Sequence, residues 1–173
     1  LSPLVNPPAE AIALDGAQRA WHFIQRAVTN GADREARWEM MMAALEGGLT
    51  FQKGLGAVHS LSHAAGALRS PTLHHGMLNG VFLPHILRFN AQSVGNKYEK
   101  LSDIFCISRK TDLATAVSDL VQSLKLPVTL GQMGFEARHI PQTVVRALAD
   151  HSNATTPRKA SAEEFDGLLR AAL

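Results

Sequence analysis

Apolar residues recur every three or four positions along most of the chain, the spacing that lines one face of a helix. The first such stripe follows Pro7 and Pro8 and consists of Ala13, Ala17, Trp21, Ile24 and Val28. Asn30 and Gly31 are typical of a helix C-terminus, so the pattern predicts that this helix ends there.

A second stripe follows Asp33, which is a good N-terminal cap. Its apolar members are Trp38, Met41, Met42, Leu45 and Leu49. Methionines beside a tryptophan could contact a cofactor, but Met also fills irregular gaps in cores. We therefore expect this stripe to be buried.

Three more helices are predicted in the second half of the chain. Thr111 or Asp112 can cap a helix that stops before Pro127 and carries Leu113, Val117, Leu120 and Leu124. A short stripe follows, made of Ile140, Val144, Val145 and Leu148. Ser161 and Glu164 have the spacing of a capping box. They open a last helix whose inward residues are Phe165, Leu168, Leu169 and Ala172.

The chain has no sustained period-two alternation and no alternation of strands with helices. Glycines interrupt the middle stretch at Gly47, Gly48, Gly54 and Gly56, which indicates close passage of backbones there. The fold class we expect is all-α, with residues 1–173 forming a single domain of about seven to nine helices.

Composition excludes several classes of function. The chain is 46% hydrophobic and 18% charged with a net charge of +2, as expected of an ordinary globular domain. Its 17 Lys and Arg are scattered, so nucleic-acid binding is not expected. No apolar run approaches the roughly 20 residues of a membrane span, and the first ten residues do not resemble a signal peptide. With Cys106 as its single cysteine, we expect a cytoplasmic protein.

Five of the eight histidines lie between Gly56 and Asn90. His59 and His63 are four residues apart, so on a helix they share one face. Ser60 stands where zinc peptidases have Glu, and no His precedes an Asp, so two metallohydrolase patterns are absent. Nucleophile-elbow and phosphate-loop motifs are absent too. Taken singly, a histidine in such a segment is more often a hydrogen-bonded or surface residue than a metal ligand, so the spacing alone does not predict a metal site.

The whole segment resembles the signature of the iron-containing, group III alcohol dehydrogenases. The matching positions are Gly56, His59, His63, Gly66, His75, Gly76, Asn79, Leu83, Pro84 and His85. The start, LSPLVNPPAEAIALDGAQRAW, is similar to the family segment that follows an Asp-x-x-x-His metal motif. The end, TTPRKASAEEFDGLLRAAL, resembles the family's closing Asn-Pro-Arg stretch and final helix. The resemblance covers essentially all 173 residues.

This resemblance implies a multi-helix bundle like the C-terminal domain of the dehydroquinate synthase-like/iron-containing alcohol dehydrogenase fold. In that family an Asp and three His hold Fe²⁺, or sometimes Zn²⁺, between two domains. By position His59 and His75 match two of the metal ligands, while the Asp and the first His should precede Leu1. The resemblance also implies a nucleotide-binding N-terminal domain, which would bind most of the NAD or NADP and which we expect to lie outside these 173 residues.

His63 matches a family histidine beside the metal, near the nicotinamide and the reacting oxygen. The resemblance therefore implies a catalytic, cofactor-contacting role for His63 in proton relay or substrate positioning. The loop from Gly66 to His75 is about two residues longer than the family pattern, so either His74 or His75 could face the metal, with the His-Gly pairing favouring His75. His85 matches a structural position, and we expect surface positions for the remaining histidines, His22, His139 and His151.

Two hypotheses follow. The first is that the chain is the metal-binding part of an NAD(P)-linked alcohol dehydrogenase that interconverts alcohols with aldehydes or ketones, is a homo-oligomer such as a dimer, and is inactive without its N-terminal domain. The alternative is a stand-alone helical module with a binding or assembly role and no catalysis. An upstream sequence without an Asp-x-x-x-His motif and a glycine-rich nucleotide loop would rule out the first.

Overall fold

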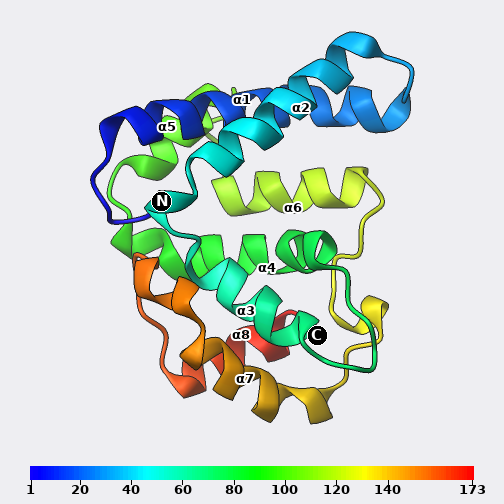
Figure 1. The fold of residues 1–173 in the computed structure, drawn as a ribbon, viewed down its shortest axis with the longest axis vertical. Coiled ribbons are helices and arrows are strands. Elements are labelled where there is room, and N and C mark those ends of the chain that lie inside the picture. Colours follow the sequence, from blue (N-terminus) through cyan, green and yellow to red (C-terminus); the bar gives the residue numbers. More distant parts are fainter.

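The N-terminal third of the chain is a long helical hairpin. Helix α1 (Pro7–Thr29) and helix α2 (Arg34–Leu49) are joined by a short turn and pack side by side along the upper edge of the molecule (Figure 1). The computed structural model describes all 173 residues. Both helices begin where the sequence predicts, because the side chains of Asn6 and Asp33 accept hydrogen bonds from the first-turn backbone amides.

Six further helices form the body beneath this hairpin. They are α3 (Gly56–Gly66), α4 (His75–Asn90), α5 (Lys97–Ile104), α6 (Leu113–Ser123), α7 (Ile140–Ala149) and α8 (Ala162–Ala171). Short 3₁₀ turns connect them: η1 (Phe51–Lys53), η2 (Ala91–Ser93), η3 (Gly131–Met133), η4 (Ala137–His139) and η5 (His151–Thr155). The chain contains no strand, so the all-α expectation is confirmed, as is the expected number of helices.

Local capping agrees with the sequence at two further helices. Asp112, and not Thr111, caps α6, because its carboxylate accepts a hydrogen bond from the backbone of Thr115. Ser161 and Glu164 form the reciprocal capping box predicted for α8. These motifs depend only on residues within one helical turn, so they can be recognised from the sequence alone.

Helix α4 runs through the middle of the body and separates two apolar cores. The larger core joins α3, α4, α7 and α8, and its fully buried side chains include Leu61, Phe82, Ile140, Phe165 and Leu169. The smaller one joins α4 to α6. The predicted stripe on α7 is only half inward, since Ile140 and Val144 are buried whereas Val145 and Leu148 are exposed.

The expectation that the stripe on α2 is buried is wrong. Trp38 is 61% exposed, Met41 67%, and Leu45 and Leu49 each 56%. The opposite face of α2 packs on α1 instead, where Ala36 is buried and Arg19 of α1 forms ion pairs with Glu39 and Glu46. Small residues and these ion pairs make the contact between the two helices, so the large apolar side chains are left pointing outward.

One glycine fixes the entry to α3. Gly54 has a φ of +80°, and a Cβ at this position would overlap the side chain of Thr155 in η5. The close approach brings the start of α3 against the end of η5. Side chains from these two segments, which are distant in sequence, therefore meet near His59.

Alanine at Gly54 should destabilise the fold by about 2 kcal/mol or more, since a left-handed conformation costs ~1–2 kcal/mol and the overlap adds strain. Urea unfolding followed by circular dichroism measures this. Gly167→Ala is the control: nothing lies within 4 Å of a Cβ placed there, so it should be neutral or stabilise α8 by up to ~1 kcal/mol. Equal effects of the two substitutions would contradict the assigned contact.

Candidate functional site

Three histidines from two helices meet at one edge of the body. His59 and His63 lie one turn apart on α3, and His75 is the first residue of α4. The ring centroids are 5.6 Å apart for His59 and His63, 5.3 Å for His59 and His75, and 5.2 Å for His63 and His75. The three residues singled out in the sequence therefore form one triangle of imidazoles.

The N-terminus of α4 distinguishes the adjacent histidines His74 and His75. His74 is the N-cap residue, and its ring lies over Gly76 instead of joining the triangle. The amide of Asn79, one turn further along, lies 3.1 Å from Nε2 of His75 and donates to it. Nε2 of His75 thus presents its lone pair toward Asn79.

Asp150 is a partner of His63 that the sequence analysis missed. Its Oδ2 lies 3.1 Å from Nδ1 of His63, and its Oδ1 accepts a hydrogen bond of 2.9 Å from the backbone of Ser152. Because a carboxylate only accepts, Nδ1 of His63 carries the proton and Nε2 is left free. The sequence signal for Asp150 was its place at the end of the α7 stripe, which by itself indicates only a helix boundary.

The remaining four histidines with a position expected from the sequence differ in their surroundings. His151 is exposed as expected, but its ring lies 6.1 Å from that of His63, so it borders the triangle. His22 forms a hydrogen bond with the carbonyl of Ile104, and His139 accepts one from the backbone amide of Glu136. Both histidines are distant in sequence from the triangle, and neither of these bonds is to one of its residues. His85 is partly buried on α4 and makes no ring contact with the triangle.

The surroundings keep two of the three imidazoles neutral. Burial lowers the pKa of His59, and the neighbouring His75 and His63 lower it further. The pKa of His75 is lowered by burial, then by His63 and His74. Burial would raise the pKa of Asp150, but hydrogen bonds from Ser152 and His63 outweigh it and lower that pKa. The site thus combines neutral imidazoles with one ionised carboxylate.

These side chains fit part of a metal site but not a whole one. Neutral imidazole is the form that binds metal ions, and His59 and His75 approach each other from different helices. No group of three or more His, Cys, Asp or Glu side chains is arranged to hold an ion. Catalytic zinc sites normally have three protein ligands. Further ligands would have to come from outside these residues.

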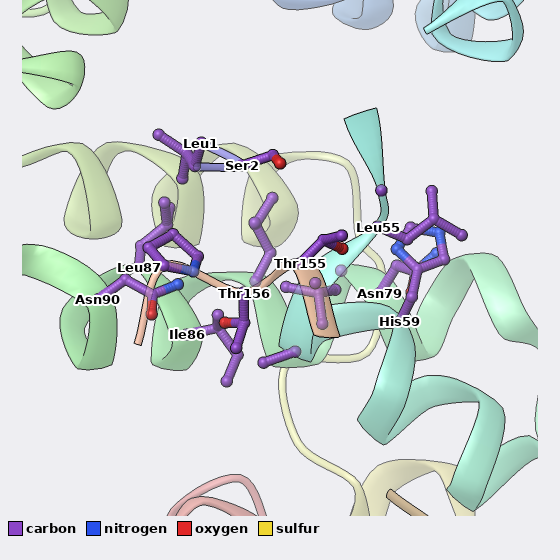
Figure 2. A pocket seen from close by; sticks show the side chains of 17 residues that line it. Leu1, Ser2, Leu55, His59, Asn79, Ile86, Leu87, Asn90, Thr155 and Thr156 are labelled. Atoms are coloured by element: carbon purple, nitrogen blue, oxygen red, sulfur yellow. The ribbon is translucent and has the colours of Figure 1, made fainter. Parts of the chain in front are cut away.

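A cavity of about 360 Å³ opens beside His59. Figure 2 shows it between the start of α3, the residues Asn79 to Asn90 of α4, the Thr155–Thr156 segment and the chain start at Leu1 and Ser2. The Oδ1 atoms of Asn79 and Asn90 are buried without a hydrogen-bond partner. The cavity is therefore lined by two residues whose amide oxygens lack a hydrogen-bond partner.

Sequence comparison identifies similar proteins over nearly the whole chain. Residues 2–173 match the profile of the Fe-containing alcohol dehydrogenase family, C-terminal. The chain is 43% identical over 176 residues to the 4-hydroxybutyrate dehydrogenase of Cupriavidus necator, covering 98% of this chain and 46% of that protein. It is 26% identical over 181 residues to the 1,3-propanediol dehydrogenase of Klebsiella pneumoniae, with shares of 99% and 46%.

Solved structures of other proteins also match this chain over nearly its whole length. A crystal structure of 1,3-propanediol oxidoreductase superposes with a TM-score of 0.91 at 26% identity, over 99% of this chain and 47% of that one. An iron-containing alcohol dehydrogenase from Thermococcus thioreducens gives 0.88 at 26% identity, over 99% and 45%. The chain thus spans about half the length of these relatives. No helix in it is long and apolar enough to cross a membrane.

Proposed function

Because this chain belongs to the iron-containing alcohol dehydrogenase family, we propose that it is the metal-binding helical domain of an NAD- or NADP-linked alcohol dehydrogenase. The reaction is the interconversion of alcohols with aldehydes or ketones by hydride transfer. The observation that supports it most is the triangle of His59, His63 and His75, whose spacing matches the family signature.

His59 and His75 are the proposed metal ligands in this domain. Both are neutral near pH 7 because their pKa values are lowered, and they extend from two different helices toward each other. Binding by Nε2 of His75 requires the amide of Asn79 to turn away, since both would use the same lone pair. A bound Fe²⁺ or Zn²⁺ supplies Lewis acidity toward the substrate oxygen.

The remaining ligands are proposed to come from the segment that precedes Leu1 in a protein of the relatives' length. Leu1 and His59 line the same cavity, so a segment entering at Leu1 can reach His59 across it. Asn79 and Asn90, whose amide oxygens have no hydrogen-bond partner, line the same cavity. With only two imidazoles, the 173-residue domain alone should bind metal weakly and should not turn over.

His63 is the proposed catalytic residue and the contact to the nicotinamide cofactor. Asp150 holds its Nδ1 proton, so Nε2 can accept or pass on a proton at the reacting oxygen. The carboxylate also stabilises the imidazolium formed when His63 takes up that proton. Asp150 is in this view a positioning residue, since its contacts are to His63 and Ser152.

An alcohol that carries a carboxylate is the first substrate to examine. The relative with 43% identity is a 4-hydroxybutyrate dehydrogenase, whereas the relatives named for 1,3-propanediol and methanol are 26% and 27% identical. We propose an ω-hydroxy carboxylate as the substrate class. The nucleotide is proposed to bind mainly to the N-terminal domain that completes the enzyme.

The test uses the protein at its natural length, loaded with Fe²⁺ or Zn²⁺ and supplied with NAD⁺ or NADP⁺. Formation of reduced nicotinamide is followed with 4-hydroxybutyrate, 1,3-propanediol and methanol as parallel substrates. Metal-dependent turnover with any of them supports the dehydrogenase, and a higher kcat/KM for 4-hydroxybutyrate supports the substrate class. Absence of both metal binding and turnover would favour the non-catalytic module.

A further inference from the structure

A substrate that carries a carboxylate needs a hydrogen-bond donor beside the imidazole triangle. The charged end group loses water when it enters a site, and this loss is costly unless donors replace the water. No Lys or Arg is among the groups that shift the pKa values of His59 and His75. The side chains that border the triangle with N–H groups of their own include two further histidines, His74 and His151.

His151 borders the triangle on the side of His63. Its ring lies 6.1 Å from the ring of His63, with 23° between the two planes. It is the first residue of η5 and directly follows Asp150, whose carboxylate contacts Nδ1 of His63 and accepts a hydrogen bond from the backbone of Ser152. Because one carboxylate holds both the ring of His63 and the start of η5, the fold defines the separation of the two imidazoles.

The imidazole of His151 is free to bind a ligand. Its side chain is 83% exposed, and its Nδ1 lies 3.9 Å from Oδ1 of Asp150, which is beyond hydrogen-bond distance. An imidazole carries at least one N–H in either of its protonation states. His151 therefore presents a donor next to the residue that we propose to act at the reacting oxygen.

The separation of the two rings matches the length of a short hydroxy acid. With bonds of about 1.5 Å, the hydroxyl oxygen and the carboxylate carbon of extended 4-hydroxybutyrate lie about 5 Å apart. We propose that His151 is a specificity-determining residue that donates a hydrogen bond to the substrate carboxylate while the substrate hydroxyl lies at His63. This inference rests on the proposed dehydrogenase function and adds the residue that selects the substrate.

The expected kinetic signature follows from where the hydrogen bond forms. A carboxylate acceptor makes the bond charge-assisted, and such bonds are about twice as strong as neutral ones. The carboxylate is remote from the reacting carbon, so His151 contacts it equally in the ground state and in the transition state. Loss of a contact of this kind raises KM and leaves kcat unchanged.

The first test compares 4-hydroxybutyrate with 1,4-butanediol, which has the same carbon skeleton and a hydroxyl in place of the carboxylate. Steady-state kinetics are measured on the metal-loaded protein at its natural length. His151→Ala should lower kcat/KM for 4-hydroxybutyrate about 10- to 100-fold, through KM, and change the value for 1,4-butanediol less than about twofold. His151→Gln keeps an N–H donor and should restore part of the loss.

His74→Ala is the matched control for this comparison. His74 neighbours His75 instead of His63, and its ring lies against Gly76. The variant should keep the wild-type ratio of the two kcat/KM values. Equal losses for both substrates in His151→Ala, or unchanged kinetics with 4-hydroxybutyrate, would overturn the proposal.

The second test measures binding without turnover. Histidine labelled with ¹³C in the Zn²⁺-loaded protein gives ring signals by NMR, and comparison with His151→Ala assigns the signal of His151. Titration with 4-hydroxybutyrate should shift this signal, whereas 1,4-butanediol should shift it several-fold less. Equal shifts, or none, would contradict the carboxylate contact. A selective shift in a protein that oxidises no alcohol would support the contact and refute the proposed dehydrogenase function, so the two failures are distinguishable.

Discussion

Alanine at His59 or at His75 should weaken binding of Fe²⁺ or Zn²⁺ more than about 100-fold, exceeding the ~10–100-fold typical of losing an outer-shell partner. Each substitution removes one of the two imidazoles that α3 and α4 bring to the proposed metal site. Metal content after dialysis, measured by atomic emission on the protein at its natural length, gives the comparison. Activity should fall in parallel.

His74→Ala and His85→Ala are the matched controls for these ligands. His74 neighbours His75 but lies outside the imidazole triangle, and His85 is one of the five histidines of the same segment. Both variants should keep their metal. Loss of metal in His74→Ala with retention in His75→Ala would reverse the assignment at the start of α4.

Metal binding is expected to weaken at low pH. The pKa values of His59 and His75 lie below the ordinary 6.5, so protons compete with the metal only at lower pH than for a free imidazole. Metal affinity should therefore stay level as pH falls to 6.5 and decline below it. The same shifts mean that the folded apo protein loses stability as pH falls through this range, since its charged imidazoles are disfavoured.

Alanine at His63 should retain the metal but reduce kcat by about 10²–10⁴, the usual contribution of a general acid–base group. The reason is that His63 is positioned by Asp150 instead of by a metal, with its Nε2 free. Stopped-flow measurement of nicotinamide reduction, together with metal analysis, separates the two properties. Loss of metal in this variant would make His63 a ligand.

Asp150→Asn extends the test to the positioning residue. It should lower kcat less than His63→Ala does, and in the double variant it should add almost nothing, because residues acting through one another are not additive. His22→Ala is the control, since His22 forms its hydrogen bond with the carbonyl of Ile104 and not with a residue of the triangle. Additive effects of Asp150 and His63 would show that Asp150 acts elsewhere in the site.

Much of the site could be predicted from the sequence because several of its residues are close together in the chain. His59 and His63 share a helix face at a separation of four residues, and Ser161 with Glu164 caps α8 within one turn. The family resemblance added His75, which the structure brings to 5.3 Å from His59. Asp150 could not be found this way, because it lies 87 positions from the histidine it contacts.

The sequence by itself determined the helical periodicity, the caps and the histidine spacing, since all of these depend on neighbours within a few residues. Only the tertiary structure decided which apolar stripe is buried. Both faces of α2 carry residues that can pack against another helix. The face with Ala36, Glu39 and Glu46 packs on α1, so Trp38 on the other face is exposed. The tertiary structure likewise decided which carboxylate meets His63. Periodicity specifies the faces of a helix, whereas the partner of each face depends on what the rest of the chain brings to it.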